Sequence, residues 1–243
     1  MNGETGDKMS NILEIPSLLD LEKTIAADLF SSFRMPWEVL ASIREFILSL
    51  GKALSPDFFW HPADGVWIAK TASVAPSASI QGPCIIDEEA QVRHCAFIRG
   101  AVIVGRHAVV GNSTELKNAV LFDRVQVPHF NYIGDSVLGY RCHIGAGGVT
   151  SNVKLDKTDV SVCYPGGKLE TGRKKFGAVL GDGAEIGCHC VLNPGTIVGR
   201  GAIVYPSLSV RGYVPAHSIY KNRHEIIGIE PVSYTHLTLP TIA

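Results

Sequence analysis

Apolar residues recur at every sixth position through the middle of the chain. The series runs through Ile68, Val74, Ile80, Ile86, Val92, Ile98, Val104, Val110, Leu116 and Phe122, and the next position in it is Pro128. A six-residue unit is too short for a helical repeat, and it is typical of a parallel β-helix in which three short strands make one coil. The pattern therefore predicts an all-β fold whose axial core is filled by these side chains.

The six-residue register changes in the second half of the chain. It shifts by one residue, is lost over residues 153–175, and resumes at Leu180. The shifted positions are Ile133, Leu138 and Ile144. A loop of about twenty residues in a compact protein is more often functional than idle. We therefore expect a β-helix over residues 61–215 with an inserted loop at 153–175 that could cover a substrate, and a short C-terminal cap at 216–231.

Residues 1–60 show a helical pattern instead. Apolar side chains recur three or four residues apart over residues 18–33 and again over residues 40–50, which predicts two helices. Pro36 suits the first turn of the second helix, and Gly51 would follow its last turn as a stop signal. The helices are expected to form a hairpin that either caps an end of the β-helix or serves in oligomerisation.

The composition is that of a globular protein, with 46% hydrophobic residues and a formal net charge of −1. This balance gives no reason to expect binding to nucleic acid or to an anionic membrane. No apolar run approaches the roughly 18 residues that span a bilayer. The six cysteines lack the paired spacing of zinc sites. We therefore expect a cytoplasmic protein with reduced cysteines and no metal site.

Five short segments carry a specific resemblance. They are FIRG around Arg99, NSTELKN around Glu115 and Lys117, HFNYIGDS at His129, HIGAGGVTSN ending at Asn152 and TGRKKFGAVLGD around Lys175. In this order they resemble the left-handed β-helix acyltransferases built from hexapeptide repeats. The resemblance is to the acetyltransferase half of bacterial N-acetylglucosamine-1-phosphate uridyltransferase, and more closely to the archaeal sugar-1-phosphate nucleotidylyltransferase/acetyltransferases. It implies that the β-helix is left-handed.

By this resemblance the protein transfers an acetyl group from acetyl-CoA to the amine of glucosamine 1-phosphate or galactosamine 1-phosphate, a step in UDP-N-acetylglucosamine biosynthesis that needs no metal. The attacking amine must lose a proton, and a histidine with an ordinary pKa of about 6.5 suits that role near neutral pH. His129 is the candidate base. Glu115 matches the family position of a carboxylate that orients the imidazole.

The phosphate of such a substrate needs fixed cations. Arg99 and Lys117 are eighteen residues apart, so they should point outward side by side from adjacent coils. Two like charges about 5 Å apart repel each other, which favours a phosphate between them; the alternative is a pair of solvated surface cations. By resemblance Tyr132 and Asn152 contact the substrate, and Lys175 reaches over it from the loop.

The acetyl donor is expected beside the IGAG turn, where a backbone N–H near Ala146 suits a developing oxyanion and small residues let a ligand approach closely. By resemblance Cys188 lies near the donor where the bacterial family has serine, and His143 binds substrate where that family has asparagine. Both differences leave the sugar and the donor open. Arg173 and Lys174 could contact the phosphates of CoA.

Three functions from different classes stay open. The first is the amino-sugar-1-phosphate N-acetyltransferase, the second is another hexapeptide acyltransferase acting on an amino acid or a nucleotide-linked sugar, and the third is a non-catalytic β-helix used in assembly or regulation. No glycine-rich nucleotide-binding loop follows a strand near the N-terminus, so uridylyl transfer is not expected. Proteins of this resemblance are trimers, which implies a homotrimer with sites between subunits. Residues 232–243 fit neither pattern, resemble translated sequencing-adaptor sequence, and are expected to be non-native.

Overall fold

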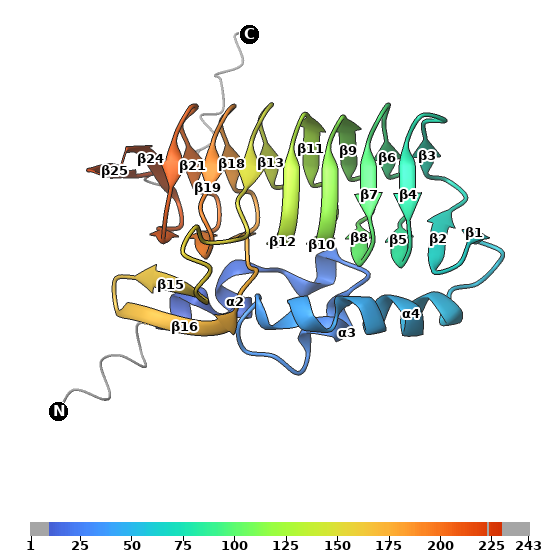
Figure 1. Ribbon diagram of the computed structural model, residues 1–243, viewed down its shortest axis with the longest axis horizontal. Coiled ribbons are helices and arrows are strands. Elements are labelled where there is room, and N and C mark those ends of the chain that lie inside the picture. Colours follow the sequence, from blue (N-terminus) through green and yellow to red (C-terminus); the bar gives the residue numbers. More distant parts are fainter. Residues whose placement is uncertain (1–9, 223, 230–243) are drawn as a thin grey trace, which may run out of the picture.

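The computed structural model describes residues 10–222 and 224–229, so the expected non-native tail lies outside the described residues. The body of the molecule is a parallel β-helix whose strands stack in three faces along the long axis (Figure 1). The expected fold class, a left-handed parallel β-helix of hexapeptide repeats, is confirmed.

Each regular coil contributes one short strand to each face, and the faces are numbered here in chain order. Face 1 contains β2 (Val66–Ala69), β5 (Cys84–Ile86), β8 (Val102–Val104), β17 (Ala178–Leu180), β20 (Thr196–Val198) and β23 (Tyr213–Val214). Face 2 contains β3 (Ser73–Val74), β6 (Gln91–Val92), β9 (Val109–Asn112), β11 (Gln126–His129), β13 (His143–Ile144), β18 (Glu185–Ile186), β21 (Ile203–Val204) and β24 (Ser218–Asn222). Face 3 contains β4 (Ser79–Gln81), β7 (Phe97–Arg99), β14 (Val149–Thr150), β19 (Val191–Leu192) and β22 (Ser209–Val210). The longer strands β10 (Glu115–Leu121) and β12 (Tyr132–Leu138) start on face 3 and end on face 1.

The core is filled largely as the repeat predicts. The fully buried positions of the first series are Ile86, Val92, Ile98, Val104, Val110, Leu116 and Phe122. Val74 and Ile80 are partly exposed, because they belong to the first coil. The assignment of Pro128 is wrong: Val127 points into the core, since it pairs with Val110 on the neighbouring coil. An interval of five residues therefore replaces one of six before Val127, whereas the sequence suggested that this happens between Pro128 and Ile133.

The N-terminal segment is helical, but its first half is not one helix. The expected second helix is α4 (Ile43–Ala53). Ahead of it lie only short turns: α2 (Ile15–Leu18), α3 (Ala27–Phe30) and 3₁₀ turns at Asn11–Leu13, Leu21–Lys23 and Glu38–Ala41. Between these turns the chain also bonds to the β-helix. The N–H of Asp182 donates to the carbonyl of Leu18 at 2.9 Å, and its carboxylate accepts the N–H of Asp20 at 2.8 Å.

This segment lies lengthwise beside the β-helix, below the strands in Figure 1. Of its two expected roles, the cap over an end is therefore wrong, and the role in oligomerisation stays a prediction. Phe30 packs edge-on against Phe122, with ring centroids 5.5 Å apart. Gly51 lies inside α4 and is not a stop signal. A Cβ on Gly51 would come within 2.4 Å of the Trp67 ring, so close packing of α4 on the first coil requires glycine there.

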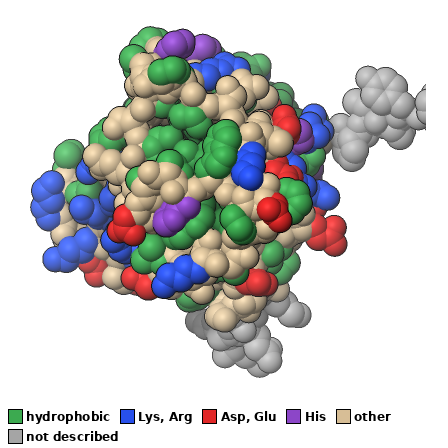
Figure 2. All heavy atoms as spheres, turned by 90° about the vertical axis from the view of Figure 1, so that its right-hand side faces the viewer, with side chains coloured by type: hydrophobic (Ala, Val, Ile, Leu, Met, Phe, Trp, Pro, Cys, Tyr) green, Lys and Arg blue, Asp and Glu red, His purple; other side chains and the backbone are tan. Residues whose placement is uncertain are grey.

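The two ends and the insertion are built from antiparallel pairs. At the start, β1 (Phe59–Ala63) pairs with β2; Figure 2 looks onto this end, where hydrophobic side chains spread over the middle of the face. The inserted loop forms the hairpin of β15 (Val160–Tyr164) and β16 (Gly167–Arg173). At the other end, β24 pairs with β25 (Glu225–Gly228). Within the described part of the chain, no helix is long and apolar enough to cross a membrane.

Candidate active site

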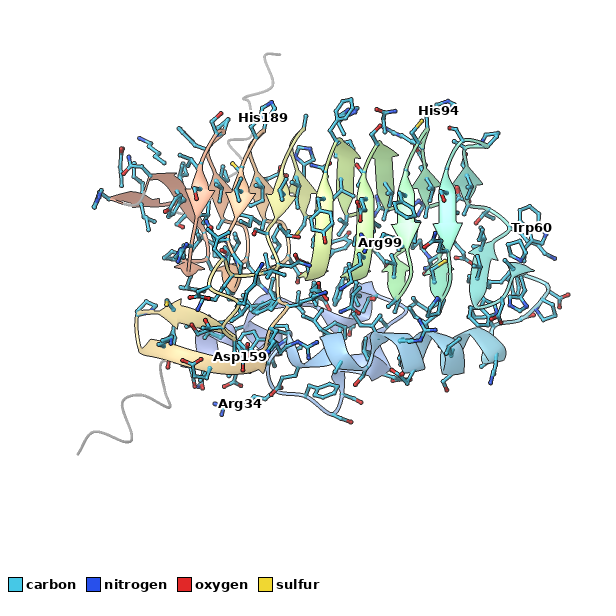
Figure 3. The ribbon with its side chains drawn as sticks, viewed as in Figure 1. Arg34, Trp60, His94, Arg99, Asp159 and His189 are labelled. Carbon is cyan, nitrogen blue, oxygen red and sulfur yellow. The ribbon has the colours of Figure 1, made fainter. Side chains whose placement is uncertain are left out.

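Face 3 carries the two cations predicted to bind phosphate. Leu116 pairs with Ile98, so Lys117 follows Arg99 at the same position of the adjacent coil. Arg99 lies in the middle of this face in Figure 3. The structure thus places the two side chains at neighbouring positions, as their spacing predicts.

Each of these cations already has a protein carboxylate. Arg99 Nη1 lies 2.5 Å from Glu115 Oε1, and Lys117 Nζ lies 3.0 Å from both carboxylate oxygens of Asp135. The argument that the two cations require an external anion is therefore wrong, because Glu115 and Asp135 supply the negative charge. The Arg99 pair is the more exposed of the two, so Glu115 is the carboxylate that an incoming phosphate could replace.

Asp135 organises this cluster, and the sequence reasoning missed it. It is 2% exposed and also accepts hydrogen bonds from Asn118 Nδ2 at 2.8 Å and from Asn152 Nδ2 at 2.5 Å. Its backbone is left-handed, with φ of 48°, a conformation that aspartate adopts more readily than most residues. Spacing alone would not have found it, because Lys117 pairs in register with Gly134 and Asp135 lies one residue further along the strand.

Tyr132 and Arg173 join the group formed by Arg99, Glu115, Lys117, Asp135 and Asn152. Together these residues are called the face 3 cluster. Asn152 Nδ2 lies 3.3 Å from the Tyr132 hydroxyl. Burial, and then the charges of Asp135 and Glu115, raise the pKa of Tyr132, so its hydroxyl stays a proton donor. Burial lowers the pKa of Arg173, while the nearby Asp135 opposes this change. The buried Nε of Arg173 has no hydrogen-bond partner among the described residues.

His129 lies on face 2, at the end of β11. Its side chain is exposed and makes no hydrogen bond with the part of the chain that the structure describes. Its backbone is fixed, because its N–H donates to Asn131 Oδ1 at 3.1 Å and its carbonyl accepts the N–H of Gly147 at 3.1 Å. The expected contact with Glu115 is absent within one chain, since Glu115 lies on face 3 and pairs with Arg99.

The donor-side residues follow His129 along one corner of the β-helix. His129 pairs in register with Asn112, and Ala146 and Cys188 occupy the same position of the next two coils. His94, labelled in Figure 3, holds this position two coils before His129 and marks the corner. The candidate base and two predicted donor residues are thus aligned.

Packing between neighbouring coils requires the glycines of the IGAG turn. Added Cβ atoms on Gly145 and Gly147 would come within 2.7 Å of atoms of Cys188 and His189 on the next coil. Both glycine N–H groups donate to main-chain oxygens. The N–H of Ala146 donates to no acceptor in residues 10–222 and 224–229, which leaves it as the candidate donor to an oxyanion.

The remaining predicted residues lie apart from both groups. His143 is on face 2, where its Nδ1 lies 2.9 Å from Glu185 Oε2. Lys174 and Lys175 are exposed and pair with no described residue. The hairpin borders an open cavity of about 590 Å³ that is lined in part by Lys168 and Arg211. No group of three or more His, Cys, Asp or Glu side chains in the described residues is arranged to hold a metal ion.

Comparison with known proteins adds the family. Residues 80–164 match the family model described as the GMPPB C-terminal domain. A bifunctional protein GlmU from Methanococcus vannielii is 28% identical over 242 residues, covering 92% of this chain and 54% of the relative. A bifunctional sugar-1-phosphate nucleotidylyltransferase/acetyltransferase from Sulfurisphaera tokodaii is 27% identical, covering 67% of this chain and 45% of the relative. The putative uncharacterized acetyltransferase YaiX of Escherichia coli is 32% identical, covering 68% of this chain and 71% of the relative.

The chain spans about half the length of the two bifunctional relatives. It covers most of YaiX, which is itself named an acetyltransferase. The chain therefore belongs to the hexapeptide-repeat acetyltransferases. The expected resemblance and the expected enzyme class are both confirmed, and the non-catalytic alternative is not supported.

Proposed function

We propose that the protein transfers the acetyl group of acetyl-CoA to the amine of an amino-sugar 1-phosphate, glucosamine 1-phosphate or galactosamine 1-phosphate. In this proposal the reaction belongs to nucleotide-sugar synthesis in the cytoplasm and needs no metal ion. The names of two relatives point the same way, since one is a GlmU and the other a sugar-1-phosphate nucleotidylyltransferase/acetyltransferase.

One observation carries the proposal above all. Arg99, Lys117, Tyr132 and Asn152 come from four coils, and they converge on the buried carboxylate of Asp135 or its immediate neighbours. The cluster offers guanidinium, ammonium, hydroxyl and amide donors in one place, which is the set that a phosphate and sugar hydroxyls require. Glu115 would leave Arg99 when the phosphate binds.

His129 performs the proton transfer. It takes a proton from the amine as the amine nitrogen bonds to the thioester carbon. The N–H of Ala146 donates to the carbonyl oxygen as that oxygen gains negative charge. When the carbon–sulfur bond breaks, the imidazolium of His129 returns the proton to the CoA sulfur, so the products are an acetamido sugar and free CoA thiol.

The complete site is proposed to form between subunits of a homotrimer. His129 and the face 3 cluster lie on different faces of one coil, and Glu115 does not reach His129 within one chain. Docking face 2 of one subunit near face 3 of its neighbour would bring base and acceptor together. Lys174 and Lys175, which pair with no other described residue, would then contact a ligand held by the neighbouring subunit.

The test is thiol release from acetyl-CoA in the presence of glucosamine 1-phosphate, galactosamine 1-phosphate or glucosamine, with the product identified by its mass. We expect a gain of one acetyl group on at least one sugar phosphate, and a much slower reaction with glucosamine. Equal rates with glucosamine would overturn the phosphate recognition. Absence of thiol release with both sugar phosphates would overturn the proposed acceptor.

A further inference from the structure

A row of left-handed residues runs along the corner where face 1 turns into face 2. It includes Glu89, His107, Arg124, Arg141 and Gly183, whose φ angles are 57°, 56°, 61°, 57° and 69°, and it continues through Gly201 and His217. Glycine, asparagine and aspartate adopt this conformation most readily. The turn itself therefore gives no reason for two consecutive coils to carry arginine in this row.

Arg124 and Arg141 are neighbours on adjacent coils. The N–H of Arg124 donates to the carbonyl of Arg106, the N–H of Arg141 donates to the carbonyl of Asp123, and Gln126 pairs with His143 just beyond them. Adjacent strands lie about 4.8 Å apart, so the two guanidinium groups start from closely spaced positions and repel each other.

No carboxylate of the described residues forms an ion pair with either arginine. Both side chains are exposed, and neither forms an ion pair or a side-chain hydrogen bond with any residue that the structure describes. Two other arginines of the β-helix differ, because Arg106 lies 2.9 Å from Glu88 and Arg200 lies 3.2 Å from Asp182.

The space between these groups is an open pocket of about 370 Å³. It is lined by Arg124, Gln126, Arg141, His143 and Glu185. Glu185 is the carboxylate in this pocket, and its Oε2 lies 2.9 Å from Nδ1 of His143. The next residue in the corner row is Gly183, where an added Cβ would have no neighbour closer than 4.0 Å. The pocket is therefore open on that side and positively charged between the two arginines.

We infer that Arg124 and Arg141 form a phosphate-binding site that serves a ligand of the acetyl-transfer site, an inference that rests on the proposed function. Planar guanidinium groups bind phosphate oxygens through pairs of parallel hydrogen bonds. Gln126 of the pocket and His129 belong to the same strand, three residues apart, which corresponds to about 10 Å. A ligand lying along face 2 therefore places its phosphate at the arginines and its reactive group near His129.

Two sources could supply this phosphate, namely CoA and the acceptor. In the face 3 cluster the cations Arg99 and Lys117 each form an ion pair with a carboxylate, whereas Arg124 and Arg141 form none with a described residue. A phosphate can therefore bind the arginine pair without first displacing a carboxylate from either guanidinium group.

The experiment is calorimetric binding to the full chain with inorganic pyrophosphate, CoA, pantetheine, glucosamine 1-phosphate and glucosamine. The variant is Arg124→Asn with Arg141→Asn, because asparagine suits the left-handed backbone and removes both charges. Its matched control is Arg44→Ala with Arg93→Ala, which removes the same charge from exposed arginines of α4 and of the turn after β6. Arg124→Lys with Arg141→Lys keeps the charge and loses the paired geometry.

We expect the Asn variant to bind pyrophosphate at least about tenfold more weakly, the Lys variant to be intermediate, and the control to bind as the wild type does. A loss for CoA but not for pantetheine identifies the coenzyme as the source; a loss for glucosamine 1-phosphate but not for glucosamine identifies the acceptor. Unchanged binding of pyrophosphate, CoA and glucosamine 1-phosphate by a folded Asn or Lys variant would overturn the inference. Because no turnover is needed, a protein that binds phosphate here but transfers no acetyl group would refute the proposed function and leave the site standing.

Discussion

Replacing Asp135 by asparagine should destabilise the protein through the loss of one buried charge. Asparagine keeps the size of the side chain and tolerates the left-handed backbone at φ of 48°. It cannot keep the hydrogen bonds, because Asp135 accepts from Lys117, Asn118 and Asn152. One of these donors would face an amide NH₂ group, and the ammonium of Lys117 would lose its counter-ion.

The size of the effect follows from burial. Removing one partner of a fully buried ion pair costs about 3–5 kcal/mol. The side chain of Asp135 is 3% exposed but that of Lys117 is 25% exposed, so water can partly solvate the ammonium. We therefore expect the free energy of unfolding to fall by about 2 kcal/mol, below the fully buried range.

The assay is denaturant unfolding followed by circular dichroism, combined with a double-mutant cycle. Asp135→Asn, Lys117→Met and the double variant should show a coupling of at least about 1 kcal/mol, since the two side chains touch. Asp159→Asn is the control, because the side chain of Asp159 is exposed and forms no hydrogen bond or ion pair with another described residue; its position beside the hairpin is marked in Figure 3. A variant Asp135→Asn that unfolds within about 0.5 kcal/mol of the control would refute the assignment of this carboxylate as the organising group.

Three further predictions concern other parts of the molecule. Gly51→Ala should lower the free energy of unfolding by about 1–3 kcal/mol, because its Cβ would overlap the Trp67 ring; an unchanged melting curve would show that α4 does not pack there. Burial raises the pKa of Asp182, so folding favours the neutral carboxyl group more than unfolding does. The stability that this group contributes is therefore present below its ordinary pKa and is lost as pH rises. The denaturation midpoint of Asp182→Asn minus that of the wild type should therefore increase as pH is raised from 4 to 7. A difference that stays constant over this range would contradict the prediction. Tyr132→Phe should raise the KM for the sugar phosphate about tenfold with little change in the KM for acetyl-CoA, and equal changes in both constants would argue against a contact with the acceptor.

Most of the fold could be predicted from the sequence, because a six-residue period constrains every coil in the same way. The core positions and the neighbouring placement of Arg99 and Lys117 follow from that period alone. The period does not show where a single five-residue interval replaces a six-residue one, since either Val127 or Pro128 could be the next core residue. The pairing of Val127 with Val110 shows that it is Val127.

The first helix and the charge partners could not be predicted, because both depend on contacts between distant segments. The apolar spacing of residues 18–33 suits a helix, but the chain forms short turns there, and at Leu18 and Asp20 it bonds to Asp182 of the β-helix. The spacing of Arg99 and Lys117 located the cations without revealing that Glu115 and Asp135 neutralise them. The roles assigned to His129 and the other site residues stay predictions.

The most direct test of the central claim compares the wild type with His129→Ala and His94→Ala in the acetyl-CoA assay with glucosamine 1-phosphate and galactosamine 1-phosphate. His94 is a matched control, because it lies on the same corner two coils away. General base catalysis contributes about 10²–10⁴-fold, so we expect kcat to fall by at least about 100-fold in His129→Ala and to stay within about twofold in His94→Ala. Equal turnover by His129→Ala and the wild type would contradict the account.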